Sequence, residues 1–89
     1  MKIIEGFKLR EVAGQSVIAG EGLKQIDFNK LIALNPTAAY LWQQVEDKEF
    51  TADTLAALLT ARYEVDEATA RKDAAGILAE WQEAGLIEE

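Results

Sequence analysis

The residues of this chain that could do chemistry are almost all carboxylates. Aspartate and glutamate together number 16, and they gather most densely at positions 46–49 and 64–67. Carboxylate oxygens are the ligands that Mg²⁺ and Ca²⁺ prefer, so each stretch could be imagined as a site for a hard metal ion. Neither has the ligand spacing or the glycine of a calcium loop, and both fall where a helix is expected to begin or end. We therefore interpret both as solvated charge and predict no metal site.

Most other catalytic groups are missing from the sequence. It has no cysteine and no histidine, which excludes the usual zinc sites, iron–sulfur clusters, thiol nucleophiles, disulfides and histidine catalysis. Ser16 is the only serine, and no histidine can activate it. The glycines at 20 and 22 lack the lysine and the strand-to-helix context of a phosphate loop. We expect no catalytic residue, no cofactor and no enzymatic activity.

Length and composition indicate one globular domain over residues 1–89. The chain is 49% hydrophobic and 28% charged, the balance of an ordinary folded domain. No apolar run approaches the ~18–20 residues that cross a bilayer. The N-terminal stretch MKIIEGFKLR has no apolar core of the kind found in signal peptides. We predict a cytoplasmic protein that does not associate with membranes.

The charge balance counts against nucleic acid as a partner. Nine basic and 16 acidic residues give a net charge of −7. After residue 50 the only cations are Arg62, Arg71 and Lys72. A phosphate backbone is bound by a basic face, which this composition does not supply. We therefore predict no binding to DNA or RNA.

The first third of the chain has the pattern of antiparallel strands. Residues 7–10 alternate apolar and charged, and 15–19 form the returning strand. Between them Ala13-Gly14 suits a tight turn, because glycine readily takes a positive φ. A third extended stretch runs from about 26 to 34, and its continuously apolar end, 31–34, is typical of a short strand buried on both faces.

Helix-start signals follow the strands. Asn35 can cap a helix, Pro36 suits its first position, and apolar residues continue at helical spacing as far as Val45. Thr51 is the next candidate cap. The residue three positions later is Thr54 rather than the Glu or Gln of a capping box, so we expect a one-sided cap.

A third helix is expected between Asp66 and Gly85, and Trp81 continues its apolar stripe into the core. Tyr40 and Trp42 are two apart on the first helix and so point ~200° apart. One of them must cover a neighbouring element or a partner. The order of elements predicts an α+β domain in which a three-stranded antiparallel sheet is followed by three helices.

The apolar strand 31–34 is the most informative feature. A short apolar strand at the edge of a sheet is a template for another chain. An extended peptide can pair with such a strand while its side chains lie against a neighbouring helix. The expected peptide contacts are Lys30, Leu31, Ile32, Ala33 and Leu34 of the strand, and Arg71, Lys72, Ala75, Leu78 and Ala79 of the third helix.

Two interpretations of this surface stay open at this point. Arg71 and Lys72 would suit an acidic, partly apolar peptide, or they would only pair locally with Glu67 and Asp73. The same strand edge would also accept a second copy of the chain. A structural or dimerising domain, joined through the edge strand, is therefore the alternative to a peptide-binding module.

The sequence resembles the PqqD-like family. The run Leu34 to Trp42, LNPTAAYLW, is similar to the family signature hydrophobic–Leu-Asn-x-Thr-x-x-x-hydrophobic-Trp. The Thr-led second helix at Thr51, the step Tyr63-Glu64-Val65 and the ending Gly85-Leu86-Ile87 match in the same order. The resemblance covers residues 5 to 88.

This resemblance implies a winged-helix-like fold and a non-catalytic role. Family members recognise the leader segment of a ribosomally synthesised precursor peptide and present it to a modifying enzyme, often a radical-SAM enzyme. The leader adds to the third strand and packs against the third helix. A transcription factor is a less favoured alternative, because the charge is wrong for DNA. The chain departs from the family pattern at Pro36, where Glu is commoner. It departs again at 74–76, where smaller residues than usual would loosen the third helix or widen the groove beside it.

Overall fold

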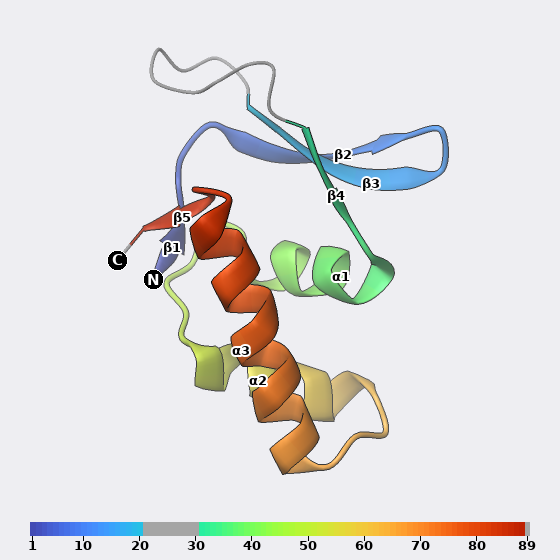
Figure 1. Cartoon of the computed structure of the whole chain (residues 1–89), viewed down its shortest axis with the longest axis vertical. Helices are drawn as coiled ribbons and strands as arrows, with labels where there is room; N and C mark the ends of the chain where they lie inside the picture. Colours follow the sequence, from blue (N-terminus) through green and yellow to red (C-terminus); the bar gives the residue numbers. More distant parts are fainter. Residues whose placement is uncertain (21–30, 89) are drawn as a thin grey trace.

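A computed structural model describes residues 1–20 and 31–88 of the chain, with only the backbone of Leu31 (Figure 1). Its strands are β1 (Lys2–Ile3), β2 (Phe7–Val12), β3 (Gln15–Gly20), β4 (Leu31–Leu34) and β5 (Ile87–Glu88). Its helices are α1 (Pro36–Val45), α2 (Ala52–Arg62) and α3 (Glu67–Glu83). The predicted α+β order, a three-stranded antiparallel sheet followed by three helices, is confirmed. The predicted start of the third strand, at 26–30, lies outside the described residues.

The β2–β3 hairpin turns where the sequence predicts. Val12 pairs with Gln15, which leaves Ala13 and Gly14 as a two-residue turn. Both turn residues have positive φ, 53° at Ala13 and 79° at Gly14. Positive φ at both positions is the geometry of a type I′ turn, whose twist matches that of the strands. Gly14 adopts it freely, whereas Ala13 is strained because its Cβ crowds the backbone.

Replacing Ala13 with asparagine should therefore stabilise the protein. Asparagine tolerates the left-handed region, and Asn-Gly is a favoured type I′ pair. We expect the free energy of unfolding to rise by about 1 kcal/mol. Urea denaturation followed by circular dichroism measures the change. Ala57→Asn, at an exposed position within α2, is the matched control and should be mildly destabilising, since asparagine is a poor helix former.

Strand β4 forms one edge of the sheet, which has the order β2-β3-β4. Leu34 is buried and Ile32 is half-buried, whereas Ala33 between them is exposed. The prediction that this strand is buried on both faces is wrong. Its side chains alternate, and only the face that carries Ile32 and Leu34 packs against the core.

The two ends of the chain lie side by side (Figure 1). β1 pairs antiparallel with β5, and Ile3 lies opposite Ile87. The amide of Ile4 also donates to the carbonyl of Leu86 at 2.9 Å. This pairing was not predicted, because a two-residue strand is too short to show an alternating pattern.

Each helix begins at its predicted cap. The Asn35 side chain accepts from the Ala38 amide at 2.8 Å, and Asp66 accepts from the Thr69 amide at 2.9 Å. The Thr69 side chain and, after it, the Thr69 amide lower the pKa of the Asp66 carboxyl, because hydrogen bonds to the carboxylate favour its charged form.

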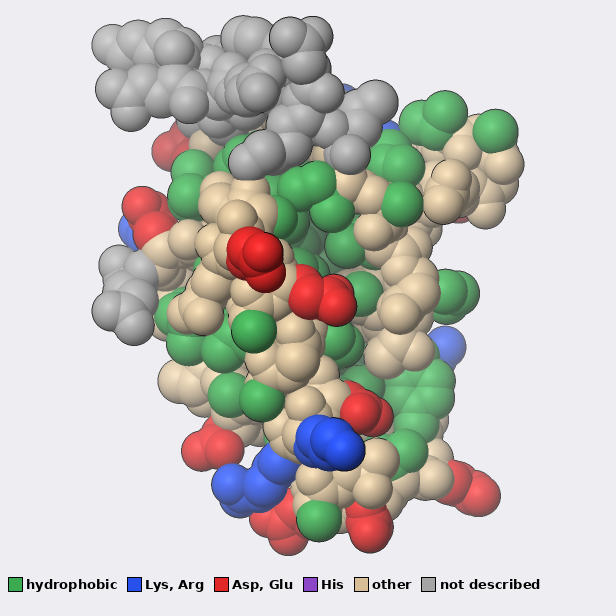
Figure 2. All heavy atoms as spheres, viewed as in Figure 1, with side chains coloured by type: hydrophobic (Ala, Val, Ile, Leu, Met, Phe, Trp, Pro, Cys, Tyr) green, Lys and Arg blue, Asp and Glu red, His purple; other side chains and the backbone are tan. Residues whose placement is uncertain are grey.

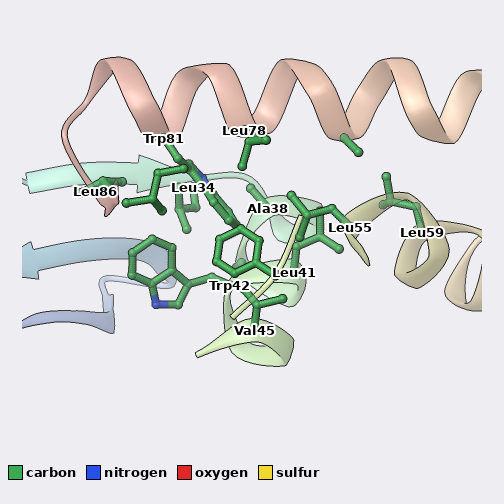
Figure 3. Close-up of a cluster of buried hydrophobic side chains, with 14 of the residues drawn as sticks. Leu34, Ala38, Leu41, Trp42, Val45, Leu55, Leu59, Leu78, Trp81 and Leu86 are labelled. Atoms are coloured by element: carbon green, nitrogen blue, oxygen red, sulfur yellow. The ribbon is translucent and has the colours of Figure 1, made fainter. Parts of the chain in front are cut away.

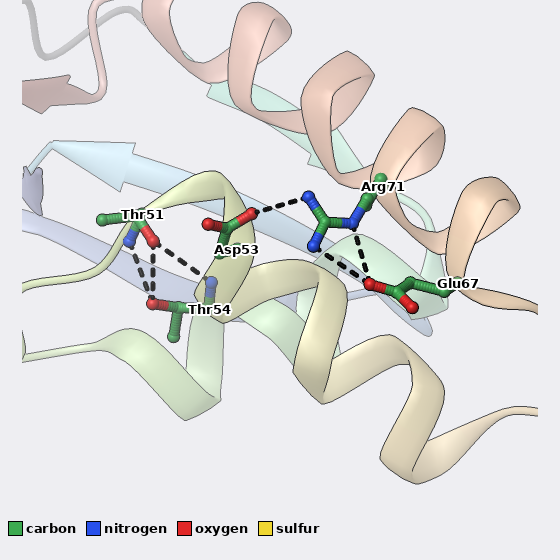
Figure 4. A network of polar contacts seen from close by, with 5 residues as sticks. All are labelled: Thr51, Asp53, Thr54, Glu67 and Arg71. Atoms are coloured by element: carbon green, nitrogen blue, oxygen red, sulfur yellow. Dashed lines mark hydrogen bonds and ion pairs between the residues drawn. The ribbon is translucent and has the colours of Figure 1, made fainter.

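The prediction of a one-sided cap on α2 is wrong. Thr51 Oγ1 accepts from the Thr54 amide at 3.2 Å, and Thr54 Oγ1 accepts from the Thr51 amide at 3.1 Å (Figure 4). A hydroxyl oxygen thus takes the place of the longer Glu or Gln side chain and completes the capping box.

The core lies where the three helices meet under the sheet (Figure 3). Trp42 of α1 and Trp81 of α3 meet edge to face with ring centroids 5.3 Å apart, and Phe50 meets Trp81 at 6.1 Å. Leu41 and Leu55 fill the space between α1 and α2 and are fully buried. The predicted place of Trp81 in the core is confirmed.

Tyr40 is the outward-facing member of the pair on α1. Trp42 is fully buried, whereas Tyr40 is half-buried and packs edge to face against Tyr63 at 6.2 Å. The Arg62 guanidinium lies 4.9 Å from the Tyr40 ring centroid, within range of a cation–π interaction. Tyr40 therefore covers the end of α2, one of the two roles that the sequence left open for it.

Candidate functional site

The backbone of β4 is paired on one side. Its residues pair with β3 in the register Ser16 to Leu34 and Ile18 to Ile32, and no described strand pairs with its other side. Within residues 1–20 and 31–88, the peptide N–H and C=O groups on that side have no partner strand. β4 is thus the unpaired edge that the sequence predicts.

The register shows which backbone groups point outward. The two-residue turn makes Val12 and Gln15 a hydrogen-bonded pair, and the N–H and C=O groups of successive residues alternate in direction along a strand. On β3, the backbone N–H and C=O of Gln15 therefore point toward β2. Those of Ile18, three residues on, point toward β4. Ile32 exchanges hydrogen bonds with Ile18, so the N–H and C=O of Ala33 point away from the sheet.

A hollow separates α3 from the end of β4 and the start of α1. Its volume is about 370 Å³, and its lining residues are Asn35, Thr37, Lys72, Asp73, Gly76, Ile77 and Glu80. Figure 2 shows hydrophobic side chains in the depression between α3 and β4, with acidic side chains along the α3 margin. A chain paired with the free edge of β4 would continue past this hollow.

The structure brings some of the predicted contact residues together. Leu31 to Leu34 form the edge strand, and Lys72 lines the hollow. Leu78 is a core residue with 8% of its surface exposed. Ala75 and Ala79 are exposed but do not line the hollow. Lys30 lies outside the described residues.

Arg71 lies on the side of α3 that faces α2 (Figure 4). Its guanidinium contacts Glu67 at 3.0 Å and Asp53 of α2 at 3.3 Å. Local pairing, the second of the two interpretations left open, therefore describes Arg71. Lys72 makes no ion pair with any residue that the structure describes, so the predicted pair with Asp73 is not formed.

Sequence reasoning missed six of the residues that line the hollow, and four of these, Asp73, Gly76, Ile77 and Glu80, belong to α3. They share one flank of α3, at the spacing of three to four residues that marks a single helix face. That spacing is visible in the sequence. It becomes informative only once the position of β4 relative to α3 is known.

The acidic stretches form no site for a cation within the described part of the chain. No group of three or more carboxylates there lies close enough to hold a metal ion. Asp66 caps α3 and Glu67 pairs with Arg71.

Among the residues that the structure describes, no helix combines the length and the hydrophobicity needed to cross a membrane.

The family model for coenzyme PQQ synthesis protein D (PqqD) matches residues 7–87. The chain belongs to the PqqD family. The match covers the sheet and all three helices, from the start of β2 into β5. No curated protein sequence matches the chain.

Two solved structures share this fold over almost their whole length. TbiB1, solved in complex with the TbiA(beta) leader peptide, is 18% identical with a TM-score of 0.77. The similarity covers 99% of this chain and 95% of that one. Lasso peptide synthetase B1, complexed with the leader peptide, is 24% identical with a TM-score of 0.74, over 99% of this chain and 96% of that one. The PqqD-family fold is therefore common to all three proteins.

Proposed function

We propose that this PqqD-family protein is a non-catalytic domain that recognises the leader segment of a ribosomally synthesised precursor peptide. The observation that carries the proposal is the unpaired edge of β4 beside a hollow along α3. Two proteins of the same fold were each solved with a leader peptide, which supports the same use of the fold here.

The leader would add to the sheet as a further strand next to β4. The Ala33 N–H would donate to the leader backbone and the Ala33 C=O would accept from it, which sets the register. Alternate side chains of the leader would then face α3. Ile77 offers them an apolar surface, and Lys72, Asp73 and Glu80 offer charge. This assignment keeps β4 and Lys72 from the sequence prediction and replaces Arg71, Ala75, Leu78 and Ala79 with residues on the other flank of α3.

Delivery to a modifying enzyme completes the proposal. The sequence lacks histidine and cysteine, so the chain has few groups with which to modify a peptide itself. A peptide-modifying enzyme, of which radical-SAM enzymes are one class, would act on the bound precursor in the cytoplasm. The domain would contribute affinity for the leader and leave the chemistry to its partner.

An amide NMR titration tests the proposal. Isotope-labelled protein is titrated with synthetic leader segments of precursor peptides encoded by the same organism. We expect the largest shift changes at Ala33 and Leu34 of β4 and at Gly76 and Ile77 of α3. Changes confined to the surface around Arg71 and Asp53 would contradict the proposed site. Shifts that depend on protein concentration without peptide would instead indicate pairing of two copies through β4.

A further inference from the structure

The charges around the hollow indicate the kind of leader segment that it accepts, an inference that rests on the proposed function. Asp73 and Glu80 both line the hollow, two turns of α3 apart and so separated by ~10 Å along the helix axis. Neither carboxylate has a hydrogen-bond or ion-pair partner among the described residues, and Lys72 is the one cation of the lining. The hollow thus presents two unpaired acids against one base.

The neighbouring cation that could neutralise this excess of negative charge, Arg71, is held elsewhere. Arg71 is bound by Asp53 and Glu67 on the α2 side of α3, away from the hollow. The whole chain also carries a net charge of −7, which attracts basic peptides and repels acidic ones during encounter. An acidic leader, one of the two interpretations of Arg71 and Lys72 that the sequence left open, would therefore meet repulsion here.

Gly76 provides the second observation. Glycine weakens the interior of a helix. Apart from the two neighbouring residues and the backbone of α3 itself, no described atom lies within 4 Å of the place where a Cβ of Gly76 would be. Packing within the described chain does not account for a glycine at this point. Gly76 does line the hollow next to the half-buried Ile77, so the missing side chain leaves open space above an apolar surface.

We infer that the leader segment on β4 carries a bulky apolar side chain and, next to it on the same face, a lysine or arginine. The apolar side chain would lie over Gly76 and Ile77, which remove it from water. The basic side chain would reach Asp73 or Glu80 at the rim. Residues i and i+2 of a strand share a face and lie ~7 Å apart. With the apolar side chain over Gly76 and Ile77, which lie between the two carboxylates along α3, the basic side chain two residues away reaches Asp73 or Glu80.

A selection from displayed random peptides tests the charge half of this inference. The wild-type protein should enrich peptides with lysine or arginine near a large apolar residue. For an enriched peptide, measured by fluorescence anisotropy at low salt, the double variant Asp73→Lys, Glu80→Lys should weaken binding about tenfold. The control Glu5→Lys, Glu49→Lys makes the same change in net charge at a separate hollow and should weaken it by less than about twofold.

A single leucine substitution tests the apolar half. Gly76→Leu should strengthen α3, because leucine is a far better helix former, and yet reduce affinity for the enriched peptide about fivefold or more, because it fills the open space. Ala79→Leu adds a similar side chain outside the hollow and should leave affinity unchanged. A rise in stability alongside the loss of binding excludes misfolding as the cause.

The outcomes separate this inference from the proposed function. Ala33→Pro blocks the free edge of β4, so every peptide that binds by strand addition should lose affinity for that variant. Peptides that are sensitive to Ala33→Pro but show no basic enrichment, or no response to the charge reversal, would overturn the inference and leave the function standing. If no selected peptide is sensitive to Ala33→Pro, the proposed function fails and the inference fails with it.

Discussion

Ala33→Pro should nearly abolish leader binding while the domain stays folded. Proline has no N–H, so the variant loses the donor that Ala33 directs away from the sheet. Its ring also occupies space that an added strand needs. Proline is tolerated on an edge strand where the N–H faces solvent, and the Ala33 side chain is exposed, so the fold should accept it. We expect affinity for a leader peptide to fall at least about tenfold.

Ile32→Pro is the matched control for this result. The Ile32 N–H faces β3, where it pairs with Ile18, so proline there removes a hydrogen bond of the sheet itself. Thermal melts followed by circular dichroism should show a clear loss of stability for Ile32→Pro and little loss for Ala33→Pro. The opposite pattern would mean that the backbone N–H of Ile32, and not that of Ala33, points away from the sheet. Tight leader binding by a folded Ala33→Pro variant would exclude strand addition at this edge.

Trp81→Ala should cause the largest loss of stability. Trp81 is 2% exposed and meets the rings of both Trp42 and Phe50. Removing a buried tryptophan costs the transfer free energy of the ring and leaves a cavity, together about 3–5 kcal/mol. A domain of this size has a free energy of unfolding of about 5–10 kcal/mol, so the variant should be largely unfolded at moderate urea concentrations.

Urea denaturation monitored by far-ultraviolet circular dichroism measures the effect. Trp81→Phe keeps an aromatic ring in place and should lose less than the alanine variant. Gln43→Ala, at an exposed position of α1 next to Trp42, should change the free energy of unfolding by less than about 0.5 kcal/mol. A loss below about 1 kcal/mol for Trp81→Ala would show that the tryptophan pair does not hold α3 against α1.

Local features of the sequence were enough to place most elements. The Ala13-Gly14 turn, the Asn35-Pro36 helix start and the Asp66 cap all lie where they were predicted. Each depends on backbone preferences within a few residues, which the sequence states directly. The capping box at Thr51 was missed because its partner Thr54 is not one of the usual residue types, although the two hydroxyls meet the same geometric need.

Contacts between distant segments could not be derived in this way. The pairing of β1 with β5 joins the two ends of the chain through strands of two residues each. Nothing within such a short strand encodes its partner, because pairing between distant segments depends on how the whole core brings them together.

The sequence by itself determined that a short apolar strand would lie at a sheet edge near the third helix, and that the chain would carry excess negative charge. Only the tertiary structure decided which flank of that helix faces the strand. The apolar stripe of α3 has two flanks with equivalent spacing, one with Arg71 and one with Asp73, Gly76 and Glu80. The buried contacts of Trp81 fix the rotation of α3, and the path of the chain fixes the side on which β4 lies, so the choice depends on packing across the whole core.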